Sequence, residues 1–94
     1  MNANNEERKM VRASKVKPMM NYLLLIEFDN GEKKIFNCHP LLEDNLYIEL
    51  KEPNIFNKVY IDEMGVVCWN NAVNINPYNL YEQSELLSNF VFAE

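Results

Sequence analysis

The sequence is poor in the residues on which most catalytic, nucleotide and zinc sites depend. Its 94 residues include two glycines, one histidine and two cysteines, and threonine is absent. Two glycines are too few for a G-x-G-x-x-G or Walker loop, in which the backbone approaches phosphate at several positions that lack a Cβ atom. A single histidine excludes an H-E-x-x-H zinc helix, and two cysteines exclude a four-thiolate zinc site.

Long hydrophobic runs are absent as well. The longest apolar run covers residues 22–26, far short of the roughly 20 residues that a membrane-spanning helix needs. The N-terminus carries charged residues before any hydrophobic stretch, unlike a secretory signal. We therefore expect a cytoplasmic protein with reduced cysteines, no membrane contact, no metal and no cofactor.

Charge is distributed unevenly along the chain, whose formal net charge is −5. Residues 1–17 carry five basic and two acidic side chains, whereas the remainder carries four lysines and twelve acids. The acidic body repels phosphates, so we expect no nucleic-acid partner, and it suits a basic protein partner. Any contact with DNA would depend on Arg8, Lys9 and Arg12. They belong to a flexible basic lead, residues 1–12, whose simpler role is that of a solvated terminus.

A hairpin is the clearest local feature. Two largely apolar stretches, 22–29 and 32–38, flank the pair Asn30-Gly31, which is typical of a two-residue type I′ turn. Such a turn fixes which side chains face each other across the two strands. The predicted pairs are Ile26 with Ile35, Leu25 with Phe36, Leu23 with Cys38, and Glu27 with Lys34.

The remaining segments predict one α+β domain over residues 13–94. We expect a short N-terminal strand over 14–19, an extended stretch over 46–50, and a short helix from Pro53 with Ile55 and Phe56 facing inward. A second hairpin is expected from 59–61 and 66–69, with Gly65 in the left-handed conformation. A helix is expected to begin at Asn76-Pro77 and to run through Leu80, Tyr81 and Leu87 toward Phe90. Together they predict a small antiparallel sheet of two hairpins plus the N-terminal strand, with the C-terminal helix packed on it. The apolar end, residues 89–92, is expected to dock on the domain itself.

An ordered set of motifs extends over roughly residues 13–83. They are Lys15-Val16-Lys17-Pro18, Leu24-x-x-Glu27-Phe28-Asp29-Asn30-Gly31-Glu32, Pro40-Leu41-Leu42, Phe56-Asn57-x-Val59, Asp62-Glu63-x-Gly65, Trp69 and Pro77-x-x-Leu80-Tyr81-Glu82. In this order and spacing the chain resembles the bacterial family called domain of unknown function 2442, small proteins related to the N-terminal module of some helix-turn-helix proteins. The resemblance implies a compact α+β fold with an antiparallel sheet, no established catalytic activity, and frequent occurrence beside another small gene. That neighbourhood underlies the suggestion that members are antitoxins of toxin–antitoxin pairs.

The connector over residues 69–77 departs from that family, whose members usually read W-P-N-G-x-D-[LI]-x-P there. Ala72 stands where the family has glycine, so the turn is either strained or of a different type. Asn74 replaces the aspartate; it keeps an oxygen that can bond neighbouring backbone N–H groups but lacks the charge.

The residues that suggest chemistry do not form a plausible catalytic set. Cys38 and His39 are adjacent, so on a strand their side chains point to opposite faces. They are therefore poor partners in a nucleophilic pair, and poor co-ligands of a metal together with Cys68. Acidic pairs at 43–44 and 62–63 fall at turns, where solvent exposure accounts for them without acid–base catalysis. We expect no enzymatic activity.

Trp69, the single tryptophan, leaves two alternatives open. Either it heads a partner surface with Asn71, Asn74, Tyr78 and Tyr81, since Trp and Tyr are common interface anchors, or it fills the core beneath the C-terminal helix.

We accordingly expect a non-catalytic protein-binding module, the antitoxin of a two-gene pair, whose partner is a small protein encoded by an adjacent gene. The alternative is a small-molecule sensor that holds an apolar ligand between sheet and helix, which requires a real pocket. A third alternative is a structural domain that autoregulates its operon through DNA binding by the N-terminus. The sequence leaves homodimerisation open.

Overall fold

A computed structural model describes residues 11–70 and 72–90 of the chain. The strands are β1 (Ala13–Met19), β2 (Leu23–Phe28), β3 (Lys33–Asn37), β4 (Tyr60–Ile61), β5 (Val67–Cys68) and β6 (Glu85–Leu86). The helices are α2 (Pro53–Phe56) and α3 (Pro77–Gln83), with short 3-10 helices η1 (Met20–Tyr22), η2 (Leu41–Glu43), η3 (Asn45–Lys51) and η4 (Leu87–Asn89). The prediction of an α+β fold is confirmed.

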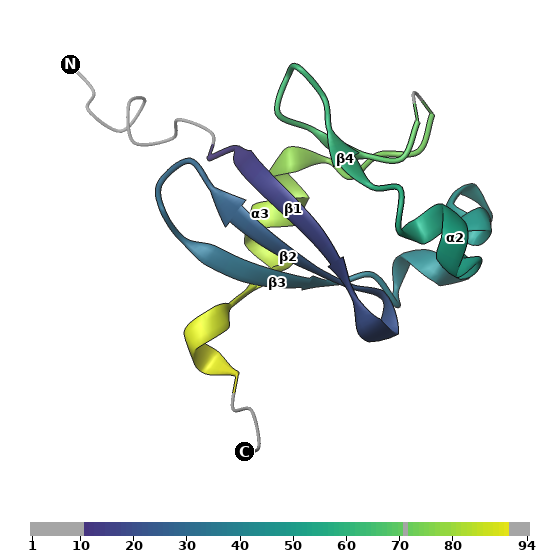
Figure 1. Cartoon of the computed structure of the whole chain (residues 1–94), viewed down its shortest axis with the longest axis horizontal. Helices are drawn as coiled ribbons and strands as arrows, with labels where there is room; N and C mark the ends of the chain where they lie inside the picture. The colour runs from purple at the N-terminus through teal and green to yellow at the C-terminus, as the bar shows by residue number, and fades with distance from the viewer. Residues whose placement is uncertain (1–10, 71, 91–94) are drawn as a thin grey trace.

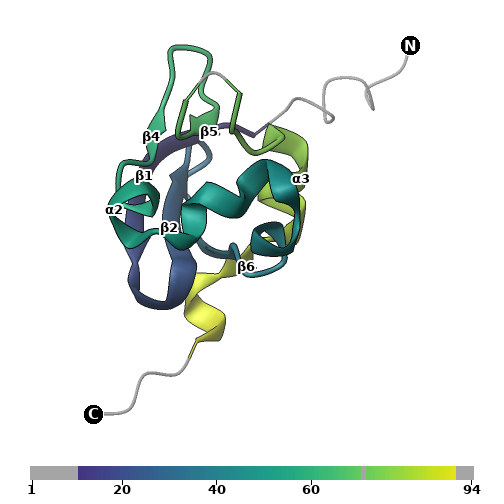
Figure 2. The same cartoon turned by 90° about the vertical axis from the view of Figure 1, so that its right-hand side faces the viewer.

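The main sheet is antiparallel with strand order β1-β2-β3-β6, and β4 and β5 form a separate two-stranded sheet. The second predicted hairpin therefore exists but does not extend the first sheet. In Figure 1, α3 lies behind the main sheet. Figure 2 shows α2 and β4 beside β1, on the side away from α3. The two faces of the main sheet thus have different surroundings.

The face of the main sheet toward α3 holds the core. Alternate residues of β2 point to it, and Leu24, Ile26 and Phe28 are at most 1% exposed, as the two-residue period of a strand requires. The other buried members of this core come from strands, helices and loops along the chain. They are Ala13, Phe36, Cys38, Leu42, Leu50, Phe56, Val67, Trp69, Val73, Ile75 and Leu80.

The first hairpin turns on three residues rather than two, so the predicted register is wrong by one position. Phe28 N–H donates to Glu32 O (2.8 Å) and Gly31 N–H donates to Phe28 O (2.9 Å), as in a type I turn closed by a left-handed glycine. Gly31 has φ +90°, but Asn30 lacks the positive φ that a type I′ turn requires. The observed pairs are Leu23 with Asn37, Leu24 with Phe36, Leu25 with Ile35, Ile26 with Lys34, and Glu27 with Lys33.

The second hairpin uses the same kind of turn. Asp62 N–H donates to Val66 O (3.0 Å), and Gly65 N–H donates to Asp62 O (2.9 Å). Gly65 has φ +82°, which confirms its predicted left-handed conformation. Arg12 crosses this turn, and its guanidinium donates to Met64 O (2.8 Å). The start of β1 is therefore tied to the β4–β5 loop.

Gly31→Ala is expected to reduce the free energy of unfolding by ~1–2 kcal/mol, because a Cβ atom is strained in the left-handed region. Crowding adds nothing to this cost, since no atom lies within 4 Å of the added Cβ. Gly31→Asn should recover most of the loss, because asparagine tolerates this conformation. Urea unfolding of both variants is the measurement, and equal losses would contradict a purely conformational cause.

The segment predicted as an extended stretch before α2 is the 3-10 helix η3, so that prediction is wrong. The Asp44 carboxylate caps it by accepting from Leu46 N–H (2.9 Å). With three residues per turn, Tyr47 and Leu50 lie on one face, and Leu50 is 1% exposed. Leu46 and Ile48 lie outside at 53% and 45% exposure. The sequence predicted an extended stretch because Leu46, Ile48 and Leu50 occupy alternate positions, as the apolar residues of a strand do.

Helix α3 begins as predicted but ends earlier. Asn76 caps it, with its side-chain oxygen accepting from two backbone N–H groups at 2.9 and 3.2 Å. Ser84 is extended after the last helical residue, and the chain continues into β6, which pairs with β3. The predicted extension of the helix to Leu87 is wrong, because pairing with β3 replaces further helical turns. Phe90 is half-buried, and residues 91 and 92 of the predicted docking end lie outside the described residues.

Candidate partner-binding surface

Trp69 lies in the core rather than on a surface. Its side chain is 7% exposed, and its indole N–H donates to Phe56 O (2.8 Å). The two aromatic rings lie 5.9 Å apart between centroids. Of the two alternatives that the sequence left open, the structure therefore gives Trp69 a place in the core, where it packs against α2.

The other predicted surface residues have different environments. Tyr78 is 61% exposed on α3, whereas Asn74 is half-buried and its backbone carbonyl accepts from Tyr47 OH (2.8 Å). Asn71, Arg8 and Lys9 lie outside the described residues. The structure thus leaves Tyr78 as the freely exposed aromatic among the described members.

Asn70 shapes the connector that lacks the glycine of the resembled family. Its side-chain oxygen accepts from Ala72 N–H (2.8 Å) and from Val73 N–H (2.9 Å). Ala72 is not among the residues with positive φ. Ala72 is therefore not strained as a residue with positive φ would be, and Asn70 instead of Asn74 bonds the backbone here.

Tyr81 connects α3 to the first hairpin. Its hydroxyl donates to the Glu32 carboxylate and accepts from Asn30 Nδ2 (3.4 Å). Its ring packs edge-on against Phe28, with 5.0 Å between centroids. The Lys34 ammonium lies 3.6 Å over the same ring and donates to Tyr81 O (2.9 Å). These contacts give Tyr81 a structural role.

We expect the Tyr81–Glu32 pair to make stability fall at both ends of the pH range. The hydrogen bond from Tyr81 lowers the pKa of Glu32 below its usual 4.5, so its contribution is present above that value and lost as the pH falls through the lowered pKa. The same bond raises the pKa of Tyr81 above its usual 10.0, so that contribution is lost as the pH rises through the raised pKa. Tyr81→Phe should flatten both limbs in urea unfolding across pH; an unchanged profile would contradict this role.

Cys38 and His39 point apart, as the sequence predicts. Cys38 is fully buried, and burial raises the pKa of its thiol to about 12. His39 is exposed, with Nδ1 2.7 Å from Asn37 Oδ1. Cys68 is also a buried free thiol.

Within residues 11–70 and 72–90, no three or more His, Cys, Asp or Glu side chains are grouped so that they could hold a metal ion. None of the helices in that part of the chain has the length and hydrophobicity needed to cross a bilayer.

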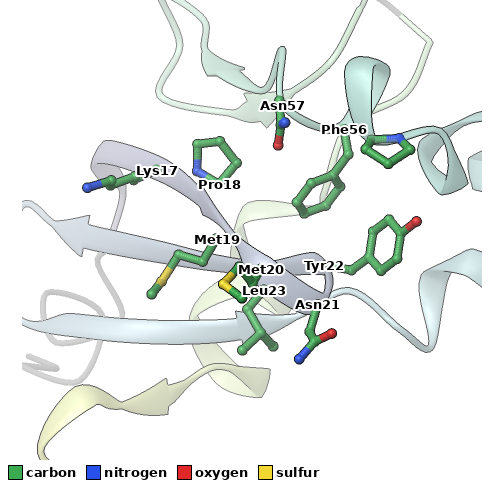
Figure 3. A pocket seen from close by; sticks show the side chains of 10 residues that line it. Lys17, Pro18, Met19, Met20, Asn21, Tyr22, Leu23, Phe56 and Asn57 are labelled. Atoms are coloured by element: carbon green, nitrogen blue, oxygen red, sulfur yellow. The ribbon is translucent and has the colours of Figure 1, made fainter.

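Two hollows border β1, and residues 53–61 line part of each. The tip hollow, about 780 Å³, is lined by residues 17–23, Pro53, Phe56 and Asn57. The face hollow, about 760 Å³, is lined by residues 14–17, Leu25, Glu27, Lys33, residues 59–61 and Leu87. Lys17 lines both hollows, which together we call the β1 groove. Figure 3 shows the tip hollow, with the Tyr22 and Phe56 rings side by side near Pro18 and Asn57.

The end of the tip hollow is formed by backbone in the left-handed region. Asn21 and Tyr22 have φ +61° and +59°, a costly conformation for a residue as bulky as tyrosine. The Tyr22 ring packs edge-on against Phe56 (5.2 Å) and His39 (5.7 Å), and its hydroxyl donates to Lys51 O (2.5 Å). These contacts hold the turn, so this wall of the hollow is preformed.

The comparisons with known proteins identify the family. The model of a family described as "Protein of unknown function (DUF2442)" matches residues 13–85. The chain belongs to the DUF2442 family. Searches of the curated proteins and of the solved structures found no significant match. The region that matches DUF2442 includes both walls of the β1 groove and excludes only Leu87 among the lining residues.

In this DUF2442 domain the charged side chains that line the face hollow are mostly positive. Lys15, Lys17 and Lys33 line it, together with the single acid Glu27. The Glu27 carboxylate lies 4.0 Å from Lys15 Nζ. The groove therefore combines apolar walls with a basic rim on a chain whose net charge is −5.

Proposed function

We propose that this DUF2442 protein is a non-catalytic protein-binding module that acts in the cytoplasm as the antitoxin of a two-gene pair. The β1 groove carries the proposal, because its two hollows measure about 780 and 760 Å³, one wall is preformed and more than half of the lining residues are apolar. Exposed apolar surface with a polar rim is typical of sites that bind other proteins. The frequent position of family members beside another small gene supports the product of that gene as the partner.

The state of the cysteine and histidine side chains supports the non-catalytic part of the proposal. A nucleophilic cysteine acts as a thiolate, whereas Cys38 is buried with a pKa raised to about 12. His39 faces away from it and has Asn37 as its neighbour at 2.7 Å. A binding role makes no demand on either side chain.

Co-expression with each adjacent gene tests the proposal. We expect one adjacent product to co-elute with this chain in gel filtration, and co-expression to relieve the growth inhibition that the product causes alone. Adjacent products that all elute separately would contradict the protein-binding role. Growth inhibition that persists although the complex forms would contradict the antitoxin role.

A small-molecule sensor is the second candidate, because the hollows measure about 780 and 760 Å³, within the range of ligand pockets, ~300–1,000 Å³. Both hollows border β1 on the side away from α3, whereas the predicted site was between sheet and helix. A thermal shift with small apolar compounds, in the absence of any protein partner, would favour this candidate.

A further inference from the structure

We propose that the β1 groove binds an acidic, partly apolar segment of a protein partner, with lysines contacting its acids and aliphatic side chains contacting its apolar residues. This inference rests on the proposed function, which supplies the partner, and adds the chemistry that the bound segment must have. It differs from the expectation based on the whole chain, whose acidic body suits a basic partner.

The charge of the groove is opposite to that of the chain. Lys15, Lys17 and Lys33 line the face hollow, and Lys17 also lines the tip hollow. Glu27 is the one acid among the lining residues, and it lies 4.0 Å from Lys15. Among the described residues, Lys17 and Lys33 have no acidic group within 4.0 Å. An acidic segment would supply the missing counter-charges and be steered to the groove.

The walls of the groove favour a protein segment over nucleic acid. Leu25 and Ile61 line the face hollow, and Met19 and Met20 line the tip hollow. Met20 is 83% exposed, and flexible thioethers adapt to varied apolar partners. Single-stranded nucleic acids instead stack their bases on exposed aromatic rings. Of the three aromatic residues that line the groove, Tyr22 and Phe56 pack edge-on against each other and Phe56 is 2% exposed, which leaves Tyr60 as the exposed one.

A second copy of this chain is a poorer fit for the groove. In a two-fold dimer the same surface faces itself, so Lys15, Lys17 and Lys33 of both copies would be brought together. Like charges across an interface oppose binding. The charge pattern therefore favours a distinct, acidic partner.

NMR titration of the full ¹⁵N-labelled chain tests the inference with three probes. They are a peptide of about 15 residues with glutamate and leucine at helical spacing, the same peptide with lysine for every glutamate, and a poly-uridine oligonucleotide. We expect only the acidic peptide to shift the amides of β1 and of residues 53–61. The dispersion of each amide spectrum verifies that the chain tested is folded.

Charge-reversal variants test whether the lysines of the groove contact the acidic peptide. Lys17→Glu combined with Lys33→Glu is expected to weaken binding of the acidic peptide about tenfold. Lys51→Glu changes an exposed side chain that lines neither hollow and keeps the backbone oxygen that accepts from Tyr22 OH. It should leave the affinity within about twofold. Shifts confined to other surfaces, equal binding of the basic peptide, or an equal loss in Lys51→Glu would overturn the inference. Tighter binding of the oligonucleotide at the same amides would also overturn it, in favour of nucleic acid.

Binding of the adjacent gene product to the double variant and to the unchanged chain distinguishes this inference from the proposed function. If it binds the double variant as tightly as the unchanged chain, the protein-binding function stands and the groove chemistry is wrong. If no adjacent product binds the unchanged chain while the acidic peptide still occupies the groove, the groove chemistry stands and the antitoxin role is wrong.

Discussion

Trp69→Ala is expected to lower the free energy of unfolding by ~3–5 kcal/mol, a large share of the stability of a domain of this size. The indole is 7% exposed, so its removal leaves a cavity in the core. Trp69→Phe keeps an aromatic ring but removes the donor that lies 2.8 Å from Phe56 O, which keeps a longer bond from Val59 N–H (3.3 Å). For the loss of this one hydrogen bond we expect a loss of ~0.5–1.5 kcal/mol. Urea unfolding followed by circular dichroism measures both values.

Binding of the acidic peptide separates a core role of Trp69 from that of an interface anchor. Truncating an anchor typically costs about 2 kcal/mol or more of binding free energy, whereas we expect folded Trp69→Phe to bind within about twofold of the unchanged chain. Tyr78→Ala is the control for an exposed aromatic residue, and its effect on stability should stay within ~0.5 kcal/mol. A Trp69→Phe chain with full stability and lost binding would contradict the core role.

The first hairpin shows why a cross-strand pattern alone can predict the wrong register. Apolar residues are consecutive in both strands, and Lys33 and Lys34 are adjacent. A shift by one position therefore still places Glu27 opposite a lysine and places Leu24 and Leu25 opposite apolar residues. The turn decides the register, because Gly31 has a positive φ and Asn30 does not. The side-chain pairs are compatible with both registers, whereas the geometry of the turn allows only one.

Local sequence signals correctly predicted the backbone conformation where a single residue determines it. Asn76 and Pro53 predicted the starts of two helices, and Gly65 predicted the left-handed position of the second hairpin. Such signals failed where tertiary contacts determine the conformation. Tyr22 adopts a positive φ because Phe56 and Lys51, both far along the chain, hold its ring and hydroxyl.

The candidate site was not predictable from the sequence, because its walls come from separate segments. Residues 14–23 and 53–61 meet only in the folded chain, and nothing in either segment alone indicates a hollow. Tryptophan and tyrosine usually indicate an interface, but two such residues that the sequence favoured do not line the groove. Trp69 is in the core and Tyr81 connects α3 to the hairpin, so the fold itself uses them. The exposed side chains that line the groove beside β1 include Met20, Tyr60 and Lys17.

Leu24→Ala is expected to affect mainly stability and Leu25→Ala mainly binding, although the two leucines are neighbours on β2. Leu24 is 0% exposed and belongs to the core, so its truncation should cost ~2–5 kcal/mol of unfolding free energy and leave peptide affinity unchanged in the folded chain. Leu25 is half-buried and lines the face hollow. Its truncation should cost ~1 kcal/mol of stability and weaken binding of the acidic peptide about tenfold.

This pair separates the fold from the binding surface within a single strand, because successive side chains of a strand point to opposite faces of the sheet. Urea unfolding and the NMR titration measure the two effects independently. If Leu24→Ala is too unstable to study, Leu24→Met conserves the volume and should cost less than ~1.5 kcal/mol. Equal losses of stability with no change in binding would mean that Leu25 is only a second core residue, and the β1 groove would then lose its binding role. Weaker binding for Leu25→Ala alone would assign that role to the face of the sheet away from α3.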